Sequence, residues 1–116
     1  MLLPDRNKAY VPPPKLTEYL LSETHAVGKS KAKFFRAFGF DETNVALLEQ
    51  GLLSIAQTET VAEVVHSPYG TKYIVDGVLE TPSGAFVQVR TVWIIEVDDA
   101  GPRLVTAYPA WQIARG

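Results

Sequence analysis

Apolar side chains recur with a helical period in the first half of the chain. Leu16, Tyr19 and Leu20 stand at positions i, i+3 and i+4, and this spacing predicts a short amphipathic helix over residues 15–22. The three consecutive prolines just before it cannot occupy the interior of a helix. We therefore expect residues 1–14 to form an extended arm that leads into this helix.

Two further helices are predicted between the arm and the middle of the chain. The first runs from about residue 27 to Gly39, which is its stop, and turns three aromatic residues toward the core: Phe34, Phe35 and Phe38. The second is capped by Asp41 or Thr43, and its apolar face comprises Val45, Leu48, Leu52 and Ile55. Gly51 is expected to weaken this second helix by about 1 kcal/mol relative to alanine.

The apolar period changes from helical to alternating after Thr58. Four segments are predicted to form strands, at residues 60–66, 72–80, 85–97 and 103–109. Along the longest of them, alternate positions form one mostly buried face: Val87, Val89, Thr91, Trp93, Ile95 and Val97. Short turns join the segments, so neighbouring strands are expected to run antiparallel, because a parallel pair needs a long crossover.

This order of elements predicts an α+β fold in which N-terminal helices pack on a four-stranded antiparallel sheet. The whole chain, residues 1–116, is expected to form a single domain, whose parts are an arm at 1–14, helices at 15–58 and a sheet at 60–109. Aromatic strand residues usually lie in protein cores, so Trp93 and Phe86 are both expected there.

Composition narrows the class of protein. Of the 116 residues, 47% are hydrophobic and 21% are charged, which indicates a globular chain rather than a disordered or fibrous one. There is no cysteine, and this excludes disulfides, thiol nucleophiles and cysteine-based zinc sites. Apolar runs are too short to span a membrane, and residues 1–5 do not resemble the start of a signal peptide. We expect a soluble, cytoplasmic protein without a membrane partner.

Charge is unevenly distributed along the chain. Residues 1–40 carry seven Lys or Arg against three Asp or Glu, whereas residues 41–64 carry five acids and no base. With a formal net charge of −2, the overall charge of the chain does not attract nucleic acid strongly. The basic run of Lys29, Lys31, Lys33 and Arg36 has two interpretations, a local phosphate site or the solvated face of a helix.

Histidine chemistry is limited to two residues. His25 precedes the basic run, where an imidazole, helix-terminal amides and several cations would lie together. Either His25 takes part in chemistry, or it caps and packs against the helix. His66 ends a strand and is expected to be an exposed structural residue. The spacing of both histidines and the nearby acids matches no metal-ligand pattern, so neither a metal nor another cofactor is predicted.

Two strand threonines and two strand tyrosines are also ambiguous. Thr91 lies between apolar residues, so it is either a satisfied core group or a donor in a site, and Thr106 raises the same question. Tyr73 and Tyr108 can stack on bases, although strands favour tyrosine in any case.

Three stretches of the sequence carry a resemblance to known domains. They are residues 20–35, with leucines, His25 and the Gly-Lys-Ser-Lys-Ala-Lys-Phe-Phe run, residues 69–73, with Tyr-Gly-Thr-Lys-Tyr, and the segments at 90–94 and 102–109. Together they resemble the DUF6883 family and the C-terminal toxin domains of some contact-dependent growth-inhibition proteins. The resemblance covers roughly residues 15–109, in the same order and with similar spacing.

The resemblance implies a metal-independent ribonuclease of the barnase–EndoU–colicin–RelE class. Such toxin domains are similar to tRNA-directed nucleases and are neutralised by a partner immunity protein. In this chemistry a ribose 2′-hydroxyl attacks the neighbouring phosphate. The matching positions are His25, Lys31, Thr91 and Thr106 for catalysis, and Arg103, Lys29, Tyr73 and Arg90 for substrate binding.

Two departures from the toxin pattern keep an alternative open. The toxins are the tails of very large secreted proteins, whereas this sequence begins at a methionine, so we expect a toxin–antitoxin component with a cognate antitoxin. The proline that commonly follows the histidine is Ala26 here. The alternative is a non-catalytic module of the same fold that binds protein or nucleic acid.

Overall fold

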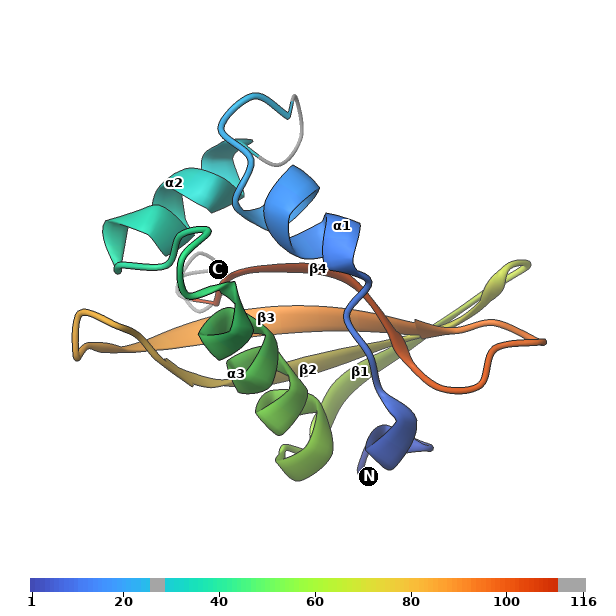
Figure 1. Cartoon of the computed structure of the whole chain (residues 1–116). Helices are drawn as coiled ribbons and strands as arrows, with labels where there is room; N and C mark the ends of the chain where they lie inside the picture. The colour runs from blue at the N-terminus through green and yellow to red at the C-terminus, as the bar shows by residue number, and fades with distance from the viewer. Residues whose placement is uncertain (26–28, 111–116) are drawn as a thin grey trace.

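Helices and a four-stranded sheet form two layers in the computed structural model, which describes residues 1–25 and 29–110 (Figure 1). The strands are β1 (Val61–Ser67), β2 (Gly70–Glu80), β3 (Phe86–Ile95) and β4 (Arg103–Pro109). They lie in the order β1-β2-β3-β4, and each neighbouring pair is antiparallel. The predicted α+β fold is therefore confirmed.

The first helix begins earlier than predicted. A short α-helix, α1 (Pro13–Lys15), continues directly into a π-helical turn, η2 (Leu16–Leu20). Pro12 is the N-cap, and prolines occupy the first helical positions, where a missing N–H and a fixed φ are favourable. The expectation that the prolines only lead into the helix is thus wrong for Pro13 and Pro14. The Leu21 amide donates to the Leu16 carbonyl at 2.8 Å, which closes the wider turn.

The second helix, α2 (Lys29–Ala37), ends as predicted. Gly39 has a φ of +99°, and its amide donates to the Arg36 carbonyl at 3.0 Å, while the Phe40 amide donates to the Phe35 carbonyl at 3.1 Å. This pair of bonds terminates a helix when the residue after its last turn is left-handed, and glycine adopts that conformation most easily. The predicted start, at residues 27 and 28, lies outside the described residues.

The third helix, α3 (Val45–Thr58), has a different N-cap from either predicted residue. Asn44 occupies that position, and the Asp41 carboxylate instead accepts from the Thr43 amide at 2.8 Å in the preceding turn. The predicted apolar face is buried at Leu48, Leu52 and Ile55.

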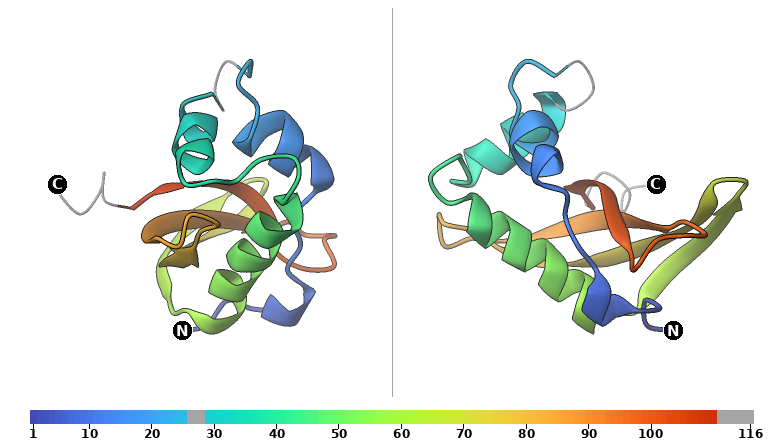
Figure 2. Two further views of the ribbon diagram at one scale, coloured as in Figure 1. Left: turned by 60° about the vertical axis from the view of Figure 1, so that its left-hand side comes forward. Right: turned by 45° about the vertical axis from the view of Figure 1, so that its right-hand side comes forward.

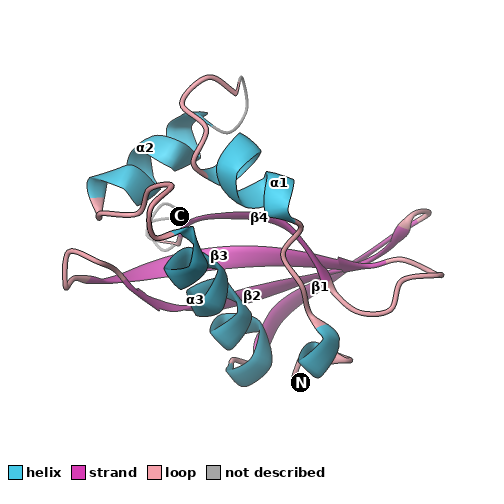
Figure 3. Ribbon diagram, viewed as in Figure 1, coloured by secondary structure: helices cyan, strands magenta, loops and turns pink. Residues whose placement is uncertain are grey.

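Gly51 has a packing role that its helix propensity conceals. A Cβ at this position would lie 2.3 Å from Cδ1 of Leu79 on β2. Glycine therefore lets α3 approach the sheet closely. Figure 3 shows α3 crossing β2 and β3, whereas α1 and α2 lie beside the edge strand β4.

The buried face of β3 is shorter than its alternation predicts. Val89, Thr91 and Trp93 are buried, but Val97 is 91% exposed because the strand ends at Ile95. Phe86 is 68% exposed, and its predicted place in the core is wrong. It pairs with Glu80 at the end of the sheet, one position out of step with the buried residues.

The N-terminal arm is fixed to the sheet. It contains a 3₁₀ turn, η1 (Arg6–Lys8), and buries Leu3 and Val11 completely or almost completely. Leu2 bridges to Thr60, and Tyr10 bridges to Arg103. Figure 2 shows this N-terminal segment in two further views of the ribbon. The arm predicted to be a lead-in is thus part of the hydrophobic core. Within the described residues, no helix is long and apolar enough to cross a membrane.

Candidate functional site

Four side chains from separate parts of the chain surround the phenol of Tyr19. The Tyr19 hydroxyl lies 3.1 Å from Oγ1 of Thr106. The Nζ atoms of Lys15 and Lys31 lie 4.8 and 5.5 Å from the centroid of the Tyr19 ring. The His25 ring meets the same ring edge to face, with centroids 5.1 Å apart and an interplanar angle of 87°. We call these five residues the Tyr19 cluster.

Local backbone geometry explains how α1, η2 and β4 meet in this cluster. Lys15 and Tyr19 are four residues apart, so they lie on one side of the first helix. Tyr19 belongs to a π-helical turn, a feature that is frequent at functional sites. The pairing of β3 with β4 is irregular at one point, because the adjacent residues Val92 and Trp93 of β3 pair with Thr106 and Leu104 of β4. Thr106 therefore lies at this irregularity, on an edge strand of the sheet.

The position of His25 is set by hydrogen bonds of its own backbone. Its amide donates to the Ser22 hydroxyl at 3.1 Å, and its carbonyl accepts from the Lys29 amide at 3.0 Å, in the first turn of α2. The side chain is exposed, and its ring contacts Tyr19. The two interpretations of His25 are therefore compatible, since the backbone supports the helix while the imidazole faces the cluster.

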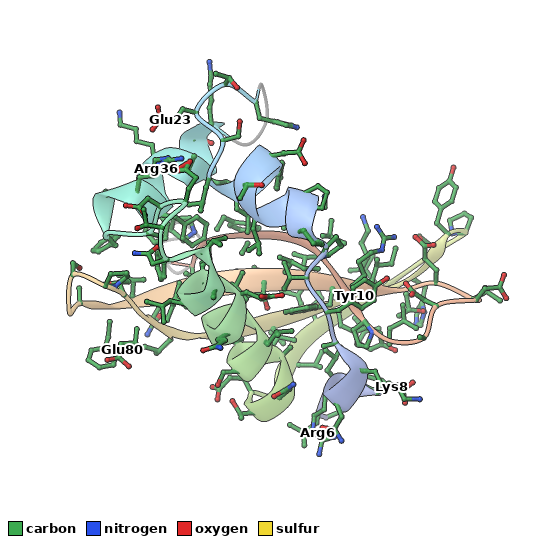
Figure 4. The ribbon with its side chains drawn as sticks, viewed as in Figure 1. Arg6, Lys8, Tyr10, Glu23, Arg36 and Glu80 are labelled. Carbon is green, nitrogen blue, oxygen red and sulfur yellow. The ribbon has the colours of Figure 1, made fainter. Side chains whose placement is uncertain are left out.

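Arg36 holds the segment that leads to His25 against α2. Its Nε and Nη2 donate to the Leu21 carbonyl at 3.0 and 2.7 Å, and Nε lies 3.1 Å from the Glu23 carboxylate. Figure 4 shows Glu23 and Arg36 next to each other at this end of the molecule. The Glu42 carboxylate, which pairs with the same guanidinium, raises the pKa of Arg36. Arg36 is thus a structural member of the basic run.

The electrostatic surroundings of Tyr19 lower the pKa of its phenol. Burial raises the pKa of Tyr19, but hydrogen bonds from Thr106 and Lys31 and the positive charges of Lys31 and Lys15 outweigh it, and the pKa is lowered from its usual value of 10.0. Among the described residues, no carboxylate lies within 4.0 Å of either lysine. The two ammonium groups therefore keep their charge available for an anion.

A groove of about 640 Å³ adjoins the cluster between α2 and β4. Lys31 belongs to both the groove and the cluster. The other lining residues combine one more cation with aromatic and small side chains, namely Ser30, Lys33, Phe34, Ala37, Tyr108 and Pro109. Aromatic faces beside cations suit single-stranded nucleic acid, because bases stack on the rings while phosphates meet the ammonium groups.

Thr91 lies in the core rather than in the cluster. It is 0% exposed, and its hydroxyl donates to the Val75 carbonyl and accepts from Nε1 of Trp93, both at 2.7 Å. Both hydrogen-bonding capacities of the hydroxyl are thus used inside the protein. Of the two interpretations of Thr91, the structure supports the satisfied core group, and we leave it out of the candidate site.

Both sheet arginines predicted to bind substrate are paired with carboxylates. Nε and Nη2 of Arg90 donate to Oδ1 and Oδ2 of Asp76 at 2.7 and 2.8 Å, and this contact raises the pKa of Arg90. Arg103 pairs with Glu96, and its Nε lies 3.9 Å from Asp99. A carboxylate already compensates the charge of each arginine, so each attracts a phosphate less strongly. Neither is therefore included in the candidate site.

The remaining predicted residues have separate positions. Lys29 is exposed at the start of α2, in the same basic run as Lys31 but outside the contacts around Tyr19. Tyr73 is half-buried against the hydrophobic core, opposite Trp93 on β3. His66 is exposed as expected, with Nδ1 3.3 Å from Oγ1 of Thr71. In the described part of the chain, His, Asp and Glu side chains form no group of three that could hold a metal.

Sequence reasoning missed Tyr19 and Lys15 as site residues. The spacing of Leu16 and Leu20 places Tyr19 on the apolar face of the first helix. The available signal is the tyrosine itself, because its hydroxyl usually finds a hydrogen-bond partner when the ring is buried. The lysine four residues earlier indicates the same polar edge.

The comparisons with known proteins agree with this fold. The model of the family described as a domain of unknown function, DUF6883, matches residues 2–111, so the chain belongs to that family. A chain of a solved structure, described as a contact-dependent growth inhibition toxin–immunity protein complex from Klebsiella pneumoniae 342, is similar with a TM-score of 0.70. The two chains are 18% identical, and the match covers 90% of this chain and 96% of the other. No curated protein matches the chain.

Proposed function

We propose that this protein is a toxin that cleaves RNA, with tRNA as the expected target, by a mechanism that uses no metal ion. The observation that carries this proposal is the meeting of His25, Lys31 and Thr106 around one phenol. These three residues come from a loop, a helix and a strand, and 75 positions separate Lys31 from Thr106. The fold shared with a chain of a toxin–immunity complex supports the toxin assignment.

The proposed reaction is attack of a ribose 2′-hydroxyl on the adjacent phosphorus. It needs a base for the 2′-hydroxyl, an acid for the leaving 5′-oxygen, and positive charge beside the phosphorane. Histidine is the side-chain type that exchanges protons most readily near neutral pH, and His25 is the histidine of the cluster. Lys15 and Lys31 would stabilise the extra negative charge, and the Thr106 hydroxyl would orient a phosphate oxygen.

The adjoining groove would receive nucleotides next to the cleaved bond. Lys33 offers a second contact for phosphate, and Tyr108 and Phe34 offer faces for bases. The chain as a whole has a net charge of −2, so sequence-independent attraction of RNA is weak. A folded target such as tRNA, which can contact several parts of the surface at once, fits these properties.

An immunity protein or antitoxin is the proposed partner. The surface it would cover contains Lys15, Lys29, Lys31 and Lys33, so we expect the partner to present carboxylates there. Opposite charges accelerate association, and a carboxylate at a phosphate position blocks RNA directly. Association should therefore become slower as ionic strength rises.

The test is incubation of the purified full chain with total tRNA in EDTA. We expect discrete cleavage products that end in a 2′,3′-cyclic phosphate and a 5′-hydroxyl. The matched variant His25→Ala should lower the rate by about 10²–10⁴-fold, the contribution of a positioned acid or base. It should keep the wild-type melting temperature, because the His25 side chain is exposed.

One outcome would contradict the proposed ribonuclease activity, and another would contradict only the role of His25. Absence of cleavage by the wild-type protein, with RNA still bound, would favour the non-catalytic module of the same fold. Full activity of the His25→Ala variant would remove His25 from the mechanism while leaving the ribonuclease assignment intact.

A further inference from the structure

Tyr19 occupies the centre of the cluster, where a second proton-transfer group is needed. Its hydroxyl is half-buried and lies 3.1 Å from the Thr106 hydroxyl, with Lys15 and Lys31 on one side and the His25 ring on another. A reaction that moves one proton from the 2′-hydroxyl and another to the 5′-oxygen uses two such groups. Tyr19 and His25 are both titratable, and their rings are in contact.

We infer that Tyr19 is a catalytic residue, the general acid that protonates the leaving 5′-oxygen, while His25 is the general base. This inference rests on the proposed ribonuclease function and assigns its two proton-transfer roles.

The division of roles follows from the ordinary chemistry of the two side chains. A tyrosine holds its proton at neutral pH and can give it away, whereas a neutral imidazole can accept one. Donation leaves a phenolate, and the ammonium groups of Lys15 and Lys31 lie where they would stabilise that anion. The lowered pKa of Tyr19, which these contacts cause against the opposing effect of burial, is consistent with an acid of increased strength.

The step balances in atoms and electrons. The 2′-oxygen forms a bond to phosphorus and releases its proton to His25, while the bond from phosphorus to the 5′-oxygen breaks and that oxygen takes the Tyr19 proton. The products are a 2′,3′-cyclic phosphate, a 5′-hydroxyl, a phenolate and an imidazolium. Proton exchange with water returns both side chains to their starting forms, so no oxidant or other co-reactant is required.

The inference separates two substrates that differ in one atom. In an oligoribonucleotide with sulfur in place of the bridging 5′-oxygen, the thiolate leaves without protonation. Tyr19→Phe keeps the ring and its contacts and removes only the hydroxyl. It should therefore lower cleavage of the oxygen substrate by about 10²–10⁴-fold and leave cleavage of the sulfur substrate nearly unchanged. His25→Ala should slow both substrates, because the 2′-hydroxyl needs its base in each case.

Tyr10→Phe is the matched control. It removes another partly exposed tyrosine hydroxyl, one that donates to the Asp99 carboxylate, and it should affect neither substrate. A measurement on the wild type needs no variant: above neutral pH, cleavage of the oxygen substrate should fall relative to the sulfur substrate as the phenol loses its proton. The charged or titratable groups that face this phenol in the described structure are Lys15, Lys31 and His25.

The outcomes distinguish the inference from the function on which it rests. Failure of the wild type to cleave either substrate would overturn the proposed function. Cleavage of the oxygen substrate by Tyr19→Phe at the wild-type rate would overturn the assignment of Tyr19 alone. An equal loss on both substrates would also overturn it, because it would show that Tyr19 holds the site together rather than protonates the leaving group.

Discussion

Two tyrosines at different places in this small protein have opposite surroundings. The Tyr10 hydroxyl donates to Oδ1 of Asp99 at 3.0 Å, in a group where Arg103 and Glu96 also pair with each other. The Tyr19 hydroxyl instead meets Thr106 and lies among lysines that no described carboxylate neutralises. Figure 4 shows Tyr10 well away from the end of the molecule that carries Glu23 and Arg36.

The comparison separates charges that pair with one another inside the fold from charges that are available to bind an anion. Around Tyr10 the charges compensate one another, and the backbone bridge between Tyr10 and Arg103 attaches the N-terminal arm to the sheet at the same place. Around Tyr19 no described carboxylate compensates the lysine charges, and they lie next to a groove with aromatic walls. Uncompensated cations cost the fold some stability through repulsion, and their presence together around Tyr19 supports the proposed site for an anion.

The largest expected effect comes from removing both lysines of the cluster. Lys15→Ala combined with Lys31→Ala should abolish measurable RNA cleavage and weaken RNA binding. Two phosphate contacts would be lost, so the slope of log affinity against log salt should fall by about 1.5. Titration of a labelled RNA at several salt concentrations gives this slope.

Lys8→Ala is the matched control for the lysine variants, since Lys8 is exposed on η1 near the N-terminus. It should leave the slope unchanged. An unchanged slope in the double variant as well would assign Lys15 and Lys31 to an ordinary solvated surface.

Substitution of the two predicted threonines should change the free energy of unfolding by different amounts. Thr91→Val leaves the buried Nε1–H of Trp93 without an acceptor, and we expect it to lower the free energy of unfolding by about 1–3 kcal/mol. Thr106→Val removes a half-buried hydroxyl whose partner can reach water, so its effect on stability should be smaller while its effect on cleavage is larger. Urea denaturation and a cleavage assay on both variants measure the two effects. Equal stability of both variants would contradict the core role of Thr91.

Much of this fold could be predicted from the period of apolar residues. The strand β4 has the predicted bounds, and β1 begins and ends within one residue of the prediction, because alternation and turn residues are local signals. The buried arm could not be predicted in this way. Leu3 and Val11 are buried in the core next to Leu2 and Tyr10, which bridge to residues far along the chain, and nothing in the local pattern specifies such contacts.

The site was predictable only in part, for a related reason. The motif containing His25 and Lys31 indicated chemistry, but periodicity counts Tyr19 as apolar and cannot show that its hydroxyl reaches Thr106 on another element. Alternation likewise cannot show that the Thr91 hydroxyl is used by Trp93 two residues away. Nor does a count of charges reveal that Arg103 is paired, because Glu96 and Asp99 reach it through the fold of the hairpin.

A smaller effect is expected at the sheet arginines. Arg103→Gln should leave RNA affinity and its salt dependence unchanged, because the guanidinium is already paired with carboxylates. The loss of a partly exposed ion pair should lower the free energy of unfolding by no more than about 1 kcal/mol. Affinity measured at two salt concentrations tests this expectation, and a reduced slope would return Arg103 to the candidate site.

The smallest effect concerns proton binding at the two tyrosines. Burial and the Asp99 carboxylate raise the pKa of Tyr10, whereas the pKa of Tyr19 is lowered despite its burial. In a spectrophotometric titration, Tyr19→Phe should remove the tyrosine that ionises at lower pH, and Tyr10→Phe should remove one that ionises at higher pH.

These shifts have opposite consequences for stability. The lowered pKa of Tyr19 stabilises the folded state above pH 10.0, the usual tyrosine value, and this stabilisation is lost as the pH falls through the lowered pKa. The raised pKa of Tyr10 stabilises the folded state below pH 10.0, and this stabilisation is lost as the pH rises through the raised pKa. Titration of both tyrosines at the same pH would show that their surroundings do not differ in charge as described.

The most direct test of the central claim is to find where RNA binds. An oligoribonucleotide with 2′-O-methyl groups cannot be cleaved by internal attack, so its complex with the wild-type protein can be followed by amide chemical shifts. We predict that the shifted resonances concentrate in η2, the start of α2 and β4 around Thr106, and that the Arg90–Asp76 pair is unaffected. Shifts centred on that pair or on the Tyr10 region, with none around Tyr19, would contradict the account.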